Sequence, residues 1–379
     1  MNIDHEFPQQ PELCYLNHAA VAPWPQRTLE AVTRFAQENV LMGATHYPRW
    51  LETERRLRKR LAKLINANGP NDIALAKNTS EALSIVAYGI QWSTGDEVII
   101  SNEEFPSNRI VWESLNTKGV KTRIVDIKQT NPEQAILDAI TPKTKLVSIS
   151  SVQYASGRRI DLTLLGNALN RRNILFCIDA IQSLGAIPFD CQACCADIVV
   201  ADGHKWMLGP EGIALLYVRP SLRRTLQLNQ FGWHMVKNRG DYDRQDWEVA
   251  DDATCFECGS PNMLGIHALE ASLSLLEALG MDQVFDQLQK NISKLIAQLK
   301  DLPGVYLISP EHPERRAGIV TFGVQGFDAT HLQRQLMENH VICAARGGGV
   351  RLSPHFYTNE TTITRAVEQL RKIISPAKN

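Results

Sequence analysis

The chain has 379 residues, 44% of them hydrophobic, which is enough apolar material for one large and one smaller core. Its formal net charge of −1 argues against a protein dominated by binding to a nucleic-acid backbone, which needs clustered excess Lys and Arg. No apolar run reaches the length of a membrane span, and the first residues lack the basic start and apolar centre of a secretion signal. We therefore expect a cytoplasmic protein with no membrane partner.

The first segment is a proline-bounded arm over residues 1–25, which contains Tyr15, Leu16, Asn17 and His18 followed by small residues. Two amphipathic helices are predicted after it, over residues 26–42 and 49–65. The basic run within the second one fits the solvated face of a helix.

A short strand, a polar turn and a helix start are predicted around Asn78, Thr79 and Ser80. The hydroxyl groups of Thr79 and Ser80 and the first amides of the helix converge on one point. This arrangement suits an anion, although an ordinary helix cap would use the same residues.

Strand and helix signals then alternate. Strands are predicted near residues 97–101, 122–127, 146–151, 174–179 and 197–201. Such alternation predicts an α/β fold with a mainly parallel central sheet, helices on both faces, and a ligand at the C-terminal edges of the strands.

Two residues at these edges indicate a chemistry. Asp179 ends an apolar strand, and Lys205 lies in a glycine-containing loop between two apolar runs. A lysine between buried strands predicts a pKa lowered by desolvation, which an amine nucleophile needs. An aspartate able to pair with a pyridinium nitrogen and a lysine able to form an imine are the minimum apparatus of pyridoxal phosphate (PLP) chemistry. The alternative is a surface turn that happens to hold a lysine.

Eight cysteines include the pairs Cys191/Cys194 and Cys255/Cys258, whose spacing could form two halves of a zinc site. The first pair falls in a loop between a helix and a strand. We expect no metal site and no disulfides, but small buried thiols.

From residue 282 the pattern changes to helix, two strands, helix, two short strands and helix. This predicts a smaller C-terminal α+β domain over 282–379, joined by a linking helix over 263–281 to a large domain over 26–262. Arg346 and Arg351 flank a triple glycine there. The glycines do not follow the first strand of a βαβ unit, which disfavours a nicotinamide-dependent oxidoreductase.

Several of these segments together resemble the class V aminotransferase family, which includes cysteine desulfurases, C-S lyases, isopenicillin N epimerase-like proteins and kynureninases. The resemblance extends over most of the chain and is carried by Asp179 with Gln182, by Gly203 to Trp206, by Gly259 to Asn262, and by Arg351 to Tyr357. It implies the PLP-dependent transferase fold type I (aspartate aminotransferase-like), with PLP as the cofactor.

The resemblance also implies residue roles. Lys205 holds the cofactor and moves the α-proton of the substrate, and Asp179 keeps the ring nitrogen protonated. The other implied cofactor contacts are Thr79, Ser80, His204 and a partner subunit's Ser260 on the phosphate, Phe105 on the ring face, and Gln182 and Gln153 on the ring oxygen. Phe105 could instead be a core residue, and Gln153 replaces an asparagine of relatives. Asp202 stands where many relatives carry serine or threonine, so its carboxylate must point away from phosphate or bind His204.

On the substrate side, the resemblance implies that Arg351 grips the α-carboxylate of a small amino acid, with Arg346 nearby. Asn17 and His18 are implied substrate contacts, with a turn-forming role as the alternative. His46 and Arg49 lie near the place of substrate-side residues from a neighbouring subunit. The segment around Ser260 implies a homodimer with shared active sites.

The reaction type rests on one cysteine. Persulfide-forming relatives carry a cysteine on a mobile loop between the positions of Arg346 and Arg351, where this chain has glycines. Cys343 lies earlier, in an apolar run where burial would raise its thiol pKa. We expect β-elimination or a related side-chain cleavage without an enzyme persulfide. Transamination and epimerisation stay open, as does a protein of this fold that only binds.

Overall fold

A computed structural model describes residues 3–375 of the chain. The strands are β1 (Cys14–Tyr15), β2 (Ile73–Ala76), β3 (Glu97–Ser101), β4 (Lys121–Val125), β5 (Thr144–Ser150), β6 (Leu175–Asp179), β7 (Ile198–Asp202), β8 (Ala214–Val218), β9 (Val305–Leu307), β10 (Val320–Val324), β11 (Val341–Ile342), β12 (Ala344–Arg346) and β13 (Gly349–Leu352). The α-helices are α1 (Gln26–Met42), α2 (Tyr47–Leu64), α3 (Thr79–Gly89), α4 (Ser107–Glu113), α5 (Pro132–Asp138), α6 (Leu162–Asn170), α7 (Pro220–Arg223), α8 (Met263–Leu279), α9 (Met281–Lys300), α10 (Ala329–Glu338) and α11 (Glu360–Ile374).

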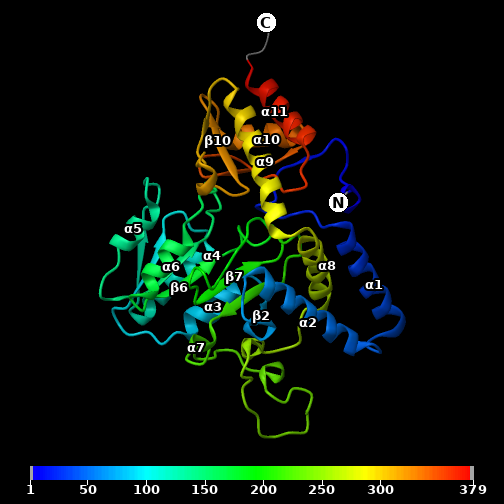
Figure 1. The fold of residues 1–379 in the computed structure, drawn as a ribbon, viewed down its shortest axis with the longest axis vertical. Helices are drawn as coiled ribbons and strands as arrows, with labels where there is room; N and C mark the ends of the chain where they lie inside the picture. The colour runs from blue at the N-terminus through cyan, green and yellow to red at the C-terminus, as the bar shows by residue number, and fades with distance from the viewer. Residues whose placement is uncertain (1–2, 376–379) are drawn as a thin grey trace.

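A seven-stranded sheet in the order β2-β8-β7-β6-β5-β3-β4 forms the larger part of the molecule (Figure 1). Strand β8 pairs antiparallel with both of its neighbours, whereas β7, β6, β5, β3 and β4 pair in parallel. The five strands predicted from the alternating pattern are β3 to β7, and the mainly parallel α/β fold is confirmed.

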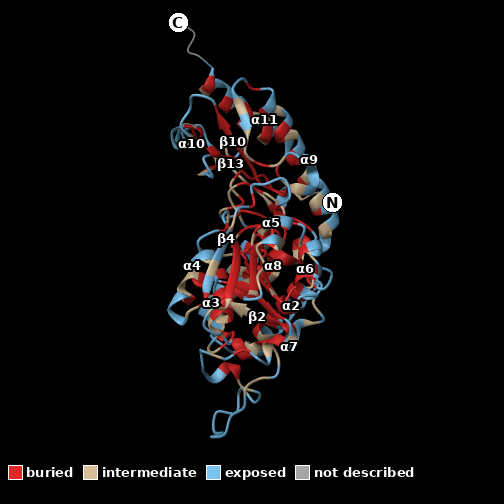
Figure 2. Ribbon diagram, turned by 90° about the vertical axis from the view of Figure 1, so that its left-hand side faces the viewer, coloured by how far each residue is buried: buried red, intermediate tan, exposed pale blue. Residues whose placement is uncertain are grey.

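Helices cover both faces of this sheet because successive strand residues point to opposite sides. Ile99 and Phe176 pack on one face with residues of α2, α6 and α8. Val98 and Cys177 pack on the other face with residues of α3 and α4. Figure 2 shows the resulting buried centre between the exposed outer surfaces of the helices. The apolar runs read from the sequence are therefore strands that are buried on both sides.

A four-stranded antiparallel sheet, in the order β12-β13-β10-β9, forms a second core with α9, α10 and α11. The predicted pattern had two short strands after α10, but there are three. The additional strand, β11, does not join this sheet; it pairs in parallel with β1 of the N-terminal arm. The sequence pattern missed it because a two-residue strand is defined only by its distant partner.

Helix α8 packs with the large sheet, since its residues Leu269, Leu273 and Leu276 are buried in that core. Helix α9 contributes Leu288 and Ile292 to the second core. The two helices meet at Gly280, whose φ of 82° lies in the left-handed region. The domain limits at residues 262 and 281 stay predictions.

Among the described residues, no single helix is long and apolar enough to cross a membrane. Within the same residues, only α8 and α9 taken together have the length and the apolar composition of a membrane span, and they are bent by 85° at their junction.

Candidate active site

Lys205 lies in the turn after β7, at the C-terminal edge of the large sheet. The residue is 9% exposed. Burial lowers the pKa of Lys205 to about 8, aided by Arg351 and opposed by the attraction of Asp179. Backbone bonds close the turn, because Leu208 N–H donates to the Lys205 carbonyl at 3.0 Å and Gly209 N–H donates to that of Gly203 at 2.9 Å. The amine is thus held in place and is easily deprotonated near neutral pH.

Asp179 is the last residue of β6, and in the sheet it lies opposite Ser150 of β5. Its carboxylate is buried and accepts the N–H of Ile181 at 3.0 Å. Burial raises the pKa of Asp179 to about 7, and the carboxylate of Glu104 adds to this increase. The protein alone therefore compensates this carboxylate poorly, and a cationic ligand would favour its charged form.

Thr79 and Ser80 open helix α3, and Asn78 caps it by accepting the N–H of Glu81 at 2.9 Å. The Thr79 hydroxyl is buried and has no hydrogen-bond partner in the structure. The Ser80 hydroxyl donates to Ser107 at 2.8 Å. An anion at this helix start would therefore find one free hydroxyl and one that is shared with a neighbour.

His204 and Asp202 lie against each other. The His204 Nδ1 atom is 3.1 Å from Asp202 Oδ1, which also accepts the N–H of Gly203 at 3.0 Å. The distance suits a contact, although the geometry at Nδ1 does not satisfy a hydrogen bond. Of the two orientations expected for the Asp202 carboxylate, the structure has the one toward His204.

Phe105 is 42% exposed, so it is not a core residue. The Lys205 Nζ atom lies 5.7 Å from the centroid of its ring. The ring of Tyr154 meets Phe105 edge-on, with centroids 5.1 Å apart. An accessible aromatic face is therefore available beside the lysine.

The two glutamines predicted near the ring oxygen are both buried. Gln182 uses its amide within the fold, since Nε2 donates to the Ala19 carbonyl at 3.0 Å and Oε1 accepts the indole N–H of Trp206 at 2.7 Å. Gln153 Nε2 donates to Glu104 at 3.1 Å, while its Oε1 atom has no partner. Gln182 therefore fastens the arm to the lysine turn, and Gln153 has the unused acceptor.

Arg351 on β13 is 2% exposed and is held by two acceptors. Its Nη1 donates to the Tyr154 carbonyl at 2.7 Å and its Nη2 to Asn17 Oδ1 at 3.4 Å, while Nε has no partner. Burial, together with repulsion from the nearby Arg346, lowers the pKa of Arg351 to about 10. A carboxylate ligand would relieve both effects.

His18, which was predicted to contact the substrate, is engaged within the fold. His18 is fully buried, with Nδ1 at 2.7 Å from the Ser353 carbonyl and Nε2 at 2.7 Å from the Tyr357 hydroxyl. Asn17 bridges Ser353 in an extended arrangement, in which neighbouring side chains point to opposite sides. Asn17 therefore reaches Arg351, whereas His18 joins the arm to the second core.

The sequence profile described as "Aminotransferase class-V" matches residues 14–366. The chain belongs to the class V aminotransferase family. It is 28% identical to a probable cysteine desulfurase from Methanothermobacter thermautotrophicus, over 98% of this chain and 97% of the relative. It is 26% identical to a cysteine desulfurase from Escherichia coli, over 93% and 88% of the two chains.

Solved structures share the fold. A C-DES mutant with glycine linked to its PLP cofactor superposes with a TM-score of 0.90 at 23% identity, covering 98% of this chain and 99% of that one. A second C-DES structure, a cystine C-S lyase with its reaction product cysteine persulfide, has a TM-score of 0.88 at 23% identity, covering 96% and 99%.

As a class V aminotransferase-family member, the protein is a PLP-dependent enzyme. Its residues fit the cofactor at three points: the amine of Lys205, the poorly compensated carboxylate of Asp179, and the unpartnered hydroxyl of Thr79. The lysine is a nucleophile for the aldehyde of PLP, the aspartate is an anionic partner for its ring nitrogen, and the threonine is a hydrogen-bond donor for its phosphate.

The prediction missed three residues that shape this class V site, namely Glu104, Tyr154 and Trp206. Glu104 lies three residues beyond the end of β3, so its position after a strand was the available signal. Tyr154 lies in the loop after β5, next to Gln153, which was the residue predicted there. Trp206 packs into the second core, which no local pattern reveals.

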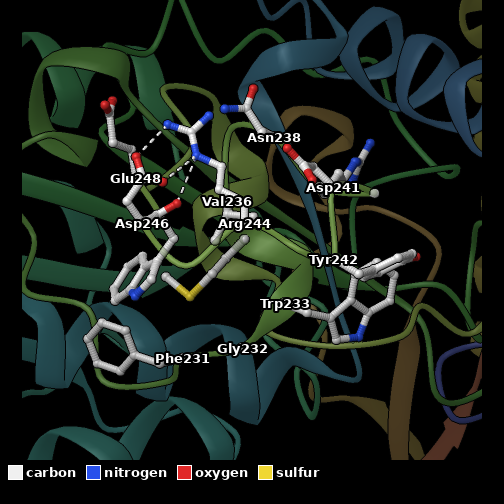
Figure 3. A pocket seen from close by; sticks show the side chains of 14 residues that line it. Phe231, Gly232, Trp233, Val236, Asn238, Asp241, Tyr242, Arg244, Asp246 and Glu248 are labelled. Carbon is white, nitrogen blue, oxygen red and sulfur yellow. Dashed lines mark hydrogen bonds and ion pairs between the residues drawn. The ribbon is translucent and has the colours of Figure 1, made fainter.

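A cavity of about 460 Å³ lies elsewhere, in the loop from Phe231 to Glu248. Figure 3 shows its lining, with Arg244 bound to Asp246 and the aromatic rings of Phe231, Trp233 and Tyr242 around the space. None of the predicted cofactor residues lines it. The presence of a cavity alone therefore does not identify the candidate active site.

The cysteine pairs do not converge. Cys191 and Cys194 are buried under one face of the large sheet, and Cys255 is buried under the other. Burial raises the pKa of Cys191 to about 11 and that of Cys255 to about 12. These thiols are apolar core groups.

Glu54, His234 and Glu257 place their oxygen and nitrogen atoms within 4.8 Å of one another. Arg58 already occupies this cluster, donating to Glu54 and, at 2.6 and 2.7 Å, to both oxygens of Glu257. Arg239 donates to His234 Nε2 at 2.9 Å, which leaves the proton of a neutral imidazole on Nδ1. The cluster is a buried ion pair with its own cation and not a metal site.

Proposed function

We propose that this class V enzyme cleaves the side chain of a small, cysteine-like amino acid by β-elimination, without an enzyme-bound persulfide. Relatives named as cysteine desulfurases and a structural neighbour named as a cystine C-S lyase support a sulfur-containing substrate. The observation that carries the second part is the hairpin between Arg346 and Arg351, which contains no cysteine.

This hairpin joins β12 to β13, with Arg346 opposite Gly349. The two residues between them, Gly347 and Gly348, have φ values of 58° and 80°, as a tight two-residue turn requires. Such a turn leaves no length for a mobile segment. Cys343, before β12, is 3% exposed, and burial raises the pKa of its thiol to about 12. Neither place supplies a thiolate able to receive sulfur.

When bound, PLP supplies an electron sink for the bonds at the α-carbon of an amino acid. Lys205, with a pKa of about 8, accepts the α-proton as a base and can return it as an acid. Arg351 holds the α-carboxylate, and its contacts with Tyr154 and Asn17 fix the direction of the guanidinium. Phe105 places an aromatic ring beside the lysine, where it would cover one face of the bound ring.

The balanced overall reaction for cysteine consumes one water and releases pyruvate, ammonia and hydrogen sulfide. The C–S bond breaks with its electron pair leaving on sulfur, and the sulfur takes up a proton. Transamination of the same substrate would instead conserve the C–S bond and leave the amino group on the cofactor. One relative is named an uncharacterized aminotransferase from Bacillus subtilis, at 27% identity, so this outcome is included in the test.

The proposal includes a homodimer with composite sites. Ser260 is exposed, and Asn262 beside it is anchored because its side chain donates to the Gly212 carbonyl at 3.0 Å and accepts from Gly265 N–H at 3.0 Å. The anchored segment presents the Ser260 hydroxyl outward, as a phosphate contact for a partner copy requires. His46 and Arg49, at the start of α2, lie outside the Lys205 site of their own chain and are assigned to the same interface.

The test incubates the PLP-loaded enzyme with cysteine, cystine and alanine, and measures pyruvate, sulfide and the visible spectrum of the cofactor. Elimination predicts pyruvate with sulfide or persulfide from the sulfur substrates and none from alanine. Cys343→Ala should react like the wild type. Stoichiometric pyridoxamine phosphate without pyruvate would establish transamination, and alanine racemisation would establish epimerisation. A Cys343 persulfide found by mass spectrometry would overturn the persulfide-free route.

The dimer has its own test. Lys205→Ala and Ser260→Asp proteins are each expected to be inactive, and mixing them after gentle dissociation should restore part of the activity through hybrid dimers. A fully active monomer would contradict the composite site.

A further inference from the structure

Glu104 is a buried carboxylate between the end of β3 and the start of α4, and it is 7% exposed. Five donor groups surround it, namely Ser101 Oγ at 2.8 Å, Asn108 Nδ2 at 2.8 Å, Ser150 N at 3.0 Å, Gln153 Nε2 at 3.1 Å, and the Ser150 hydroxyl. The residue thus ties β3, α4 and β5 together beneath the candidate active site.

The directions of these bonds favour a negative charge on Glu104. The indole N–H of Trp112 can only donate, and it donates to Asn108 Oδ1 at 2.9 Å, so Asn108 must turn its NH₂ group toward Glu104. The backbone N–H of Ser150 is likewise a donor only. Both carboxylate oxygens accept from such groups, and hydrogen bonds of this kind stabilise the charged form of a carboxyl group.

No cation accompanies this charge. Between residues 3 and 375, no Lys, Arg or His side chain forms an ion pair with Glu104, and its contacts are the neutral donors named above. Burying an anion that has no ion-pair partner is unfavourable even when the anion is well hydrogen-bonded. A purely structural role would not require the negative charge. A glutamine side chain has the same shape and could bind these neighbours once their amide and hydroxyl groups reorient.

The charge lies close to the PLP-binding groups. Ser150, which gives Glu104 two of its bonds, is directly opposite Asp179 in the sheet. The charged groups facing this region are Asp179, Asp202, His204, Lys205, Arg346 and Arg351. Asp179 at the end of β6 and Glu104 after β3 therefore lie on either side of β5, close enough for their charges to interact.

We propose that Glu104 is a positioning residue for the proposed reaction, and that its fixed negative charge, added to that of Asp179, keeps the ring nitrogen of bound PLP protonated. The inference rests on the proposed function for the direction of Asp179 toward the ring. Glu104 acts through the field and through Gln153, whose amide it orients so that Oε1 stays free to accept. The raised pKa of Asp179, to which Glu104 contributes, is consistent with this field.

Glu104→Gln is the informative variant, because it removes the charge and keeps the shape. The new amide oxygen can accept from Asn108 and Ser150. The new NH₂ group can donate to the Ser101 hydroxyl and, after a flip of the Gln153 amide, to the Gln153 Oε1 atom that now lacks a partner. The variant is therefore expected to fold and to bind PLP.

The experiment measures the ring-nitrogen protonation of ¹⁵N-labelled PLP by NMR, and the pH titration of the visible band, in the holoenzymes. We expect the ring nitrogen to be protonated in the wild type at neutral pH. In Glu104→Gln the midpoint of ring-nitrogen protonation and the midpoint of the visible-band titration should both fall by about one pH unit or more. A shift of this size is expected when a unit charge several ångströms away in a protein interior is removed.

Two variants separate charge from structure. Ser150→Ala removes one of the bonds but keeps the charge, and Glu104→Asp keeps the charge with a shorter side chain; both should titrate within a few tenths of a unit of the wild type. Glu103 is the neighbouring carboxylate, and it accepts a hydrogen bond from Ser156 at 2.7 Å. Glu103→Gln should shift the midpoints less than Glu104→Gln does.

Unchanged midpoints in a folded Glu104→Gln holoenzyme would overturn the inference, as would equal shifts in all the variants. If Glu104→Gln does not fold, a deprotonated ring nitrogen in the wild type at neutral pH overturns it as well. These readouts need no turnover. If the enzyme releases pyruvate and the midpoints are unchanged in Glu104→Gln, only the role of Glu104 is rejected. If the midpoints shift but no substrate yields pyruvate, only the elimination reaction is rejected.

Discussion

The two sides of the candidate active site are built in different ways. The side that holds Asp179 and Lys205 consists of residues at the ends of neighbouring parallel strands, so one sheet places them. The side that holds Arg351 and Asn17 combines the second sheet with the N-terminal arm, more than 300 residues apart in sequence. The first side depends on strand order alone, whereas the second depends on two parts of the chain docking correctly.

The largest expected effect is on the first side. Lys205→Ala removes the amine that we propose as the carrier of the α-proton, so turnover of any substrate should fall by roughly 10³-fold or more. Borohydride reduction of the holoenzyme should no longer attach PLP to the protein. Lys59→Ala, which changes an exposed lysine on α2, is the control and should behave like the wild type. PLP trapped on another lysine would show that the first side has been assigned wrongly.

Asp179→Asn should act next most strongly. The amide keeps the shape and the bond to Ile181 N–H but removes the charge opposite the ring nitrogen. We expect exchange of the substrate α-proton with solvent to slow by roughly 10²-fold while PLP still binds. An unchanged exchange rate, measured by NMR in deuterated buffer, would count against the pairing.

On the second side, Arg351→Lys tests the carboxylate contact. A lysine cannot make the two-pronged bond, and the loss of about 2 kcal/mol should lower kcat/KM roughly 30-fold, mostly through KM. Arg371→Lys, on the exposed face of α11, is the matched control. A normal KM in Arg351→Lys would mean that the substrate carboxylate is bound elsewhere.

The smallest effect on turnover is expected from His18, which should influence stability. Burial lowers the pKa of His18 from 6.5 to about 4, so the folded state holds the neutral ring and the unfolded state takes up the proton first. His18 therefore contributes stability above pH 6.5 that is lost as the pH falls toward 4, by up to about 3 kcal/mol.

Urea unfolding between pH 4 and 7 would measure this loss. His18→Asn should unfold at lower urea at pH 7 and show a weaker pH dependence, with a KM close to that of the wild type. A large rise in KM without a loss of stability would restore His18 to the substrate side.

The same contrast explains what the sequence could predict. Lys205, Asp179 and Thr79 each follow a strand or open a helix, so local patterns and the order of elements were sufficient to predict the fold and this side of the site. Glu104 was missed because a pair of glutamates after a strand reads as surface charge, and only the tertiary structure supplies its five donors. The surroundings of His18 could not be predicted, because the face toward which an extended residue points depends on its partner strand.

Trp206 has a further consequence for exchanging parts between relatives. It follows Lys205 directly, yet its ring is fully buried in the second core, where a Cβ atom on Gly318 would lie 2.1 Å from it. Its carbonyl lies 3.1 Å from His355 Nε2. A chimaera that takes its C-terminal part from another family member must therefore bring a glycine at position 318 and a matching group at position 355, or the backbone beside Lys205 loses its anchor.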